Sequence, residues 1–97
     1  MVIISQRPLR EFWEKHPSAR EALNAWYTFV NECDWGRHAD VVRDFGSADY
    51  VADGRYVFNI RGNTYRLVAR IHFASRTVFI RFVGTHPQYD KIDAGTI

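Results

Sequence analysis

Hydrophobic and polar positions alternate along three consecutive stretches in the C-terminal half of the chain. These stretches cover residues 56–61, 64–73 and 77–85, and short segments rich in turn-forming residues separate them. Alternation with a period of two is typical of a strand with one buried face. Gly62 and Asn63 fill the first gap, as expected for a tight hairpin. This half of the chain therefore predicts an antiparallel meander of three strands.

The N-terminal half has a helical pattern instead. Residues 2–4 are a short β-branched run that predicts an initial strand, and two helices are predicted to follow over 8–16 and 18–33. Ser18 and Glu21 have the spacing of a capping box at the start of the second helix. The apolar positions at helical spacing are Leu9, Phe12 and Trp13 in the first helix and Ala19, Ala22, Leu23, Trp26, Phe29, Val30 and Cys33 in the second.

Residues 34–54 have the least regular pattern. Val41 and Val42 favour a short helix there, and Phe45 is predicted to anchor the loop to the core. Asp53 and Gly54 indicate a turn before the first strand of the meander. The tail, 86–97, is short, polar and only lightly apolar.

Together these elements predict an α+β fold as one domain over residues 1–97: a short strand, two helices and an antiparallel meander, with the helices packed on one face of the sheet. Period-two alternation assigns the strand residues to two faces. The inner face is predicted to carry Tyr56, Phe58, Ile60, Tyr65, Leu67, Ala69, Ile71, Phe73, Val78, Ile80 and Phe82. The outer face is predicted to be open to solvent and to carry Asn59, Arg61, Arg66, Arg70, His72 and Arg81.

Charge changes this picture because it is unevenly distributed. The net charge is only +2, but residues 50–97 hold seven Lys and Arg against three acids, and residues 55–89 hold six arginines and no acid. Arginine matches phosphate oxygens two at a time and stays charged at cellular pH. Exposed strands also carry basic residues to prevent edge-to-edge pairing, but that role would accept lysine and interleaved acids. The sheet therefore predicts a polyanionic partner, RNA or DNA.

The sequence contains no motif that is typical of other classes of function. The single cysteine, Cys33, allows no internal disulfide and is expected to be a buried, inert thiol. The four scattered histidines form no recognisable set of metal ligands, and no glycine-rich phosphate loop opens a helix. Neither a signal peptide nor a membrane span is apparent. We expect a cytoplasmic protein with no metal, cofactor or membrane association.

Residues 84–90 follow the last predicted strand and contain the candidate chemistry. His86 can accept or donate a proton near neutral pH, and Tyr89 can stack on a base or orient a phosphate. A lone histidine in a terminal segment is also an ordinary surface residue, so spacing alone leaves both readings open. His72 is a second candidate phosphate contact, or a packing residue.

Several segments resemble, in order and over nearly the whole chain, the HigB family of bacterial type II toxins. The segments are LREFW at 9–13, AWY at 25–27, VFNIRGNTYRLV at 57–68, FIRFVGTH at 79–86 and YDKI at 89–92. That family belongs to the RelE-like superfamily of messenger-RNA interferases. The resemblance implies a RelE-like fold and metal-independent, ribosome-dependent cleavage of mRNA. It also implies neutralisation by a HigA-like antitoxin with a helix-turn-helix DNA-binding domain.

In this superfamily the ribose 2′-OH attacks the adjacent phosphate, which leaves a 2′,3′-cyclic phosphate and a free 5′-OH. The resemblance assigns Arg66 to the phosphate-stabilising role, His86 to the base or acid, and Tyr89 and Asp90 to supporting catalytic positions. The residues expected to bind RNA are Asn59, Arg61, Arg70, His72, Arg81 and Lys91. Two alternatives remain open: a module of the same fold that binds RNA or the ribosome without cutting, and a relative that acts on a protein.

Overall fold

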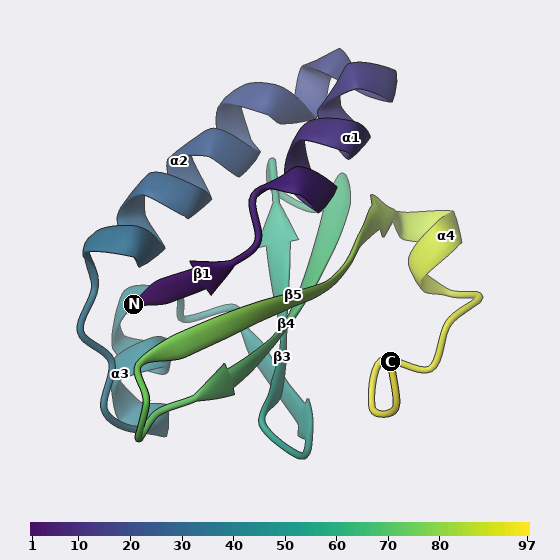
Figure 1. Ribbon diagram of the computed structural model, residues 1–97. Helices are drawn as coiled ribbons and strands as arrows, with labels where there is room; N and C mark the ends of the chain where they lie inside the picture. The colour runs from purple at the N-terminus through teal and green to yellow at the C-terminus, as the bar shows by residue number, and fades with distance from the viewer.

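The computed structural model describes residues 1–97 as an open five-stranded sheet with its long helices on one face (Figure 1). In chain order the elements are β1 (Val2–Ile4), α1 (Arg7–Lys15), a 3₁₀ turn (Pro17–Ala19), α2 (Arg20–Glu32), α3 (His38–Asp44), β2 (Asp49–Ala52), β3 (Arg55–Ile60), β4 (Tyr65–His72), β5 (Thr77–Thr85) and α4 (His86–Tyr89). The predicted α+β class is confirmed. No helix is long and apolar enough to cross a membrane.

The strands lie in the order β1-β5-β4-β3-β2. Strands β2 to β5 form the antiparallel meander, and β1 pairs with β5 in parallel. Because β1 is short, it covers only Thr77–Phe79 of β5. The second half of β5 therefore has a free edge, and α1 lies beside this strand (Figure 1).

The main core lies between the helices and the inner face of the sheet. Leu9 of α1 and Leu23 and Val30 of α2 are fully buried there, opposite Phe58 and Leu67 of the sheet. The predicted helical faces are thus largely correct. Apolar burial of this kind is the main force that holds such a sandwich together. Phe29 is an exception, because it remains 46% exposed at the end of α2.

Trp35 anchors the irregular segment that precedes β2. Its ring is fully buried against Phe45 and Phe58, and its indole N–H donates to Asp44 Oδ2 at 2.9 Å. The predicted short helix around Val41 and the anchoring role of Phe45 are confirmed as α3 and its C-terminal cap. Hydrogen bonds from Arg43 and then Trp35 lower the pKa of the Asp44 carboxyl.

A bulge in β5 overturns one part of the predicted face assignment. Ala69 pairs with Ile80 but Val68 pairs with Phe82, so Arg81 is an extra residue in β5. An extra residue reverses the alternation beyond it. The prediction that Phe82 faces the helices is therefore wrong: its ring packs on the outer face, and Val83 packs against the main core instead.

The expectation of an open outer face is also wrong. Val57 and Val68 are buried there under the C-terminal tail, which turns back over the sheet after α4 (Figure 1). Ala94 is buried in this outer cluster, and Phe82, Tyr89, Ile92 and Ile97 pack around it. The tail looked polar because its few apolar residues are widely spaced along the sequence.

Local details of the turns differ from the expectations. Ser18 makes no helix cap, because it lies within the 3₁₀ turn and α2 starts only at Arg20; its hydroxyl bonds to the Tyr65 hydroxyl instead. The β3–β4 loop has four residues, since β3 ends at Ile60 and β4 begins at Tyr65. Arg61 and Gly62 both have positive φ there, which carries Arg61 out of the strand alternation. Strand β2 was missed.

Replacing Trp35 by Phe tests the contact between its indole and Asp44. A carboxyl with a lowered pKa stabilises the fold above its unfolded pKa, about 3.9, and this contribution disappears as pH falls through the folded pKa. We expect Trp35→Phe to lower the urea midpoint at pH 7, with a deficit that narrows below about pH 4. Trp26→Phe is the control, because the Trp26 indole N–H bonds to no group. A Trp35→Phe deficit that is equal at both pH values would contradict this role.

Candidate active site

Arg66 lies on the outer face of β4, opposite Asn59 of β3 and Gly84 of β5. Its guanidinium is held by the β3–β4 loop: Nη2 donates to Asn63 Oδ1 at 2.6 Å and Nη1 to the Asn63 carbonyl at 3.2 Å. No carboxylate pairs with Arg66, so its charge is fixed in position but not neutralised. An oriented and unpaired guanidinium is suited to binding a phosphate.

The helix α4 begins where β5 ends, and its start is well defined. Thr85 caps it: the Thr85 hydroxyl accepts the Gln88 amide at 3.3 Å and the Gln88 side-chain oxygen accepts the Thr85 amide at 2.9 Å. This reciprocal capping box fixes a one-turn helix that would not form alone. It holds His86 and Tyr89 at the end of the sheet that carries Arg66.

His86, the first residue of α4, forms a pair with Asp90, the residue that follows the helix. The distance from His86 Nδ1 to Asp90 Oδ2 is 3.3 Å, and both side chains are partly exposed, at 45% and 62%. A carboxylate at Nδ1 favours the tautomer with the proton on that nitrogen, which leaves the Nε2 lone pair available. The pair therefore provides an oriented imidazole at the rim of the outer face.

Tyr89 connects α4 to Arg66. The Arg66 Cζ atom lies 5.9 Å from the centre of the Tyr89 ring, within the range of a cation–π contact. The Tyr89 ring also lies 6.4 Å from the Phe82 ring, which covers Gly84. A Cβ atom at Gly84 would lie 2.3 Å from Phe82 Cζ, so only glycine allows Phe82 to lie there. The four predicted catalytic residues are thus gathered at one end of the outer face.

The residues predicted to bind RNA are scattered by comparison. Asn59 lies opposite Arg66, and exposed Lys91 follows α4. Arg81 is the bulge residue, and its Nε lies 3.4 Å from the main-chain oxygen of Ile97. Arg61 lies beside α2 rather than on the outer face, because the left-handed turn redirects it.

The two remaining predicted RNA contacts are engaged within the chain. Arg70 is bound by Asp53, with Nη2 at 3.5 Å from Oδ2 and Nε donating to the Asp53 carbonyl. His72 Nδ1 bonds to Ser75 Oγ at 2.8 Å and stabilises the β4–β5 turn. Two acids from outside the acid-free segment, Asp53 and the more distant Asp34, pair with three of its six arginines: Arg55, Arg70 and Arg76. The expectation that no acid pairs with the arginines of the sheet is therefore wrong.

The structure offers little support for a metal site, a cysteine nucleophile or an enclosed active-site pocket. No three His, Cys, Asp or Glu side chains gather where they could hold a metal ion. Burial, followed by the nearby Asp44 charge, raises the pKa of the Cys33 thiol, which reduces its nucleophilicity. None of the four cavities of the molecule is lined by Arg66, His86, Tyr89 or Asp90. The candidate site is an open surface.

Comparison with known proteins identifies the family. Residues 19–92 match the model of the HigB toxin family, described as a RelE-like toxic component of a toxin–antitoxin system. This chain belongs to the HigB toxin family. The mRNA interferase HigB of Shigella flexneri is 34% identical to it over 96 residues, which are 97% of this chain and 92% of that protein. The mRNA interferase HigB of Escherichia coli O6:H1 strain CFT073 is 30% identical over 94 residues, which are 95% of this chain and 91% of that protein.

Three contributors to this HigB-family site were missed from the sequence. The Thr85–Gln88 spacing is a capping-box signal, so α4 was detectable. Asn63 was assigned only to a turn, although its side chain also orients Arg66. The role of Phe82 had no detectable signal, because it depends on a bulge that the alternation does not reveal.

Gly84→Ala tests the close packing of Phe82 beside Arg66. The added methyl must displace the Phe82 ring, and overpacking of this kind costs about 1–3 kcal/mol of unfolding free energy. We expect Phe82→Leu to offset part of the loss in the double variant, because it removes the atoms that clash. Urea denaturation of the two single variants and the double variant gives the coupling. Additive losses would show that Phe82 does not occupy this position.

Proposed function

We propose that this chain is the toxin of a type II toxin–antitoxin system and acts as a ribosome-dependent mRNA endoribonuclease. The observation that carries the proposal is the meeting of Arg66, held without a carboxylate, with the His86–Asp90 pair at one end of the sheet. Phosphate binding and proton transfer are the two functions that RNA cleavage by a 2′-OH requires. The relatives named as mRNA interferases support the same reading.

The proposed reaction needs no group beyond the RNA and these side chains. The ribose 2′-OH gives its proton to a base and its oxygen forms a bond to the adjacent phosphorus. Negative charge accumulates on the phosphoryl oxygens, where Arg66 stabilises it. The bond to the 5′-oxygen then breaks, and that oxygen takes a proton. The products are a 2′,3′-cyclic phosphate and a 5′-OH.

His86 is assigned the proton transfers because its Nε2 atom is free while Asp90 lies at Nδ1. Asp90 orients the imidazole. Tyr89, in contact with Arg66, is assigned to stacking on a base or orienting the phosphate. Asn59, Arg81 and Lys91 are assigned to the RNA path around this end of the sheet, whereas Arg61, Arg70 and His72 are assigned no direct role.

The openness of this site supports dependence on the ribosome. None of the cavities is lined by Arg66 or His86, so the chain offers no enclosed site that would hold the 2′-OH in line with the leaving oxygen. Positioning of that kind accounts for much of the rate of such reactions. We assign it to the ribosome, which already holds the mRNA in a fixed geometry.

The toxin class implies an antitoxin as partner. We propose that it is a HigA-like protein with a helix-turn-helix DNA-binding domain and that the pair acts in the cytoplasm, where translating ribosomes are found. Co-purification of this chain with the product of an adjacent reading frame tests this part of the proposal.

Two substitutions test the assignment of the site. Arg66→Ala removes the stabilising cation and is expected to reduce cleavage about 100-fold to 1,000-fold. His86→Ala removes the proton carrier and is expected to reduce it about 100-fold to 10,000-fold. The measurement is mapping of mRNA 5′ ends after induction of each variant, with growth as a second readout.

Arg70→Ala is the matched control, since it removes an arginine from the same strand that Asp53 already neutralises. Cleavage by this variant is expected to stay within about threefold of the wild type, because the partly exposed ion pair it removes contributes little. Full cleavage by both Arg66→Ala and His86→Ala would refute the assigned site. Growth arrest by the wild type without new mRNA ends would show that the chain binds without cutting.

A further inference from the structure

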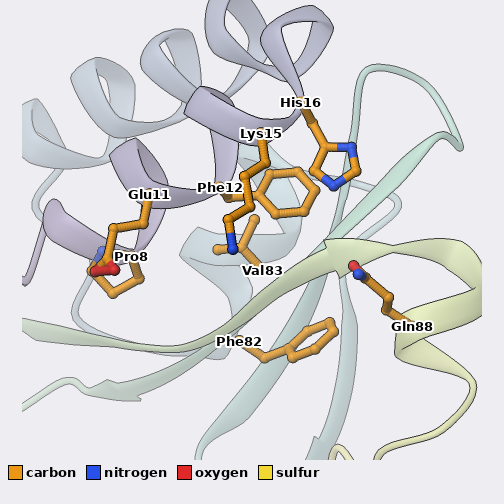
Figure 2. A pocket seen from close by; sticks show the side chains of 8 residues that line it. All are labelled: Pro8, Glu11, Phe12, Lys15, His16, Phe82, Val83 and Gln88. Atoms are coloured by element: carbon orange, nitrogen blue, oxygen red, sulfur yellow. The ribbon is translucent and has the colours of Figure 1, made fainter.

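A groove crosses the free edge of β5 next to the candidate active site. It has a volume of about 450 Å³ and lies between α1 and the end of β5, where β1 no longer covers the strand. Figure 2 shows Phe82 and Val83 leaving β5 on opposite sides, so the groove runs from the outer face over the edge towards α1. This volume is within the range of small-molecule sites, about 300–1,000 Å³.

Aromatic rings line the groove on the side of α1. Phe12 and His16 stack with their ring centres 4.4 Å apart and their planes at 22°, and the His16 ring lies 6.2 Å from Tyr65. Phe82 lies on the other side of β5 from these rings, at the outer-face end of the groove (Figure 2). Rings exposed in a groove are the usual surfaces on which single-stranded bases stack.

Two polar side chains of the groove, Lys15 and Gln88, offer free hydrogen-bond donors. Lys15 pairs with no carboxylate, because Glu11, one turn before it on α1, binds Arg7 at 3.1 Å. The Gln88 side-chain oxygen is occupied by the Thr85 amide, which leaves the Gln88 NH₂ group to donate. The ammonium can bind a nucleotide phosphate, the amide NH₂ can donate to acceptor atoms of a base, and the aromatic rings can stack on the face of a base.

The groove is continuous with the candidate active site through two shared residues. Phe82 lines the groove and also packs near Tyr89, and Gln88 lies on α4 between His86 and Tyr89. A strand whose phosphate lies at Arg66 would therefore reach the groove with its neighbouring nucleotide.

We propose that this groove binds the nucleotide adjacent to the cleaved phosphate, with Lys15 contacting its phosphate and His16 stacking on its base. The inference rests on the proposed function, because it takes its RNA from the same site. It adds a binding subsite built from α1, outside the arginine-bearing sheet. Lys15 has no part in the proton transfers, so it affects binding rather than the chemical step.

The first test is kinetic and uses Lys15→Glu on programmed ribosomes under single-turnover conditions. We expect the half-saturating ribosome concentration to be about tenfold higher than for the wild type, because one attractive phosphate contact is replaced by a repulsive one. The rate at saturation is expected to stay within about twofold of the wild type. Arg10→Glu is the matched control: it makes the same charge change on an exposed position of α1 outside the groove. Equal weakening by both variants would overturn the proposal, because it would reveal only an effect of overall charge.

The second test locates the nucleotide without requiring cleavage. An mRNA with a single thiouridine next to the cut position is cross-linked to the His86→Ala variant on ribosomes, and the modified peptides are identified by mass spectrometry. Cross-links in the segment with Lys15 and His16 support the subsite, even though this variant does not cut. Cross-links confined to β3 and β4 overturn it. Normal cleavage by Lys15→Glu with weakened antitoxin binding also overturns it, and assigns the groove to the protein partner.

Discussion

The single extra residue in β5 determines how the functional end of this molecule is built. Arg81 shifts the register between β4 and β5, so Phe82 turns to the outer face and Val83 turns to the core. From the outer face Phe82 covers Gly84 and approaches Tyr89, whose ring in turn lies near Arg66. Without the bulge Phe82 would point towards the helices. Bulges commonly redirect side chains next to active sites, and this one has that effect.

The outer cluster then restricts where a polyanion can bind. The tail covers Val57 and Val68 at the centre of the outer face, and its last residue accepts hydrogen bonds from Arg55 and Arg81. Asp53 neutralises charge at the far end of β4. What remains is a local cationic site at Arg66, next to α4. Electrostatic attraction is thus concentrated where proton transfer is available, instead of being spread over the sheet.

The sequence predicted the architecture well because that architecture depends on local patterns. Helical spacing located α1 and α2, and alternation located β3 to β5, since each burial pattern lies within its own element. The catalytic candidates came from a resemblance, and the structure brings them together. Arg70 and His72 could not be judged from the sequence, because their partners Asp53 and Ser75 become visible only in the folded chain. Likewise, the outer cluster depends on contacts between distant segments, which alternation does not report.

In the proposed reaction Arg66 and the His86–Asp90 pair promote attack by the ribose 2′-OH. The most direct test places one 2′-deoxynucleotide at the cut position of an mRNA bound to ribosomes and follows cleavage by the wild-type chain. The account predicts that cleavage at that linkage disappears, whereas the unmodified mRNA gives fragments with 5′-OH ends. Cleavage that persists at the 2′-deoxy position, or fragments with 5′-phosphate ends, would contradict the account.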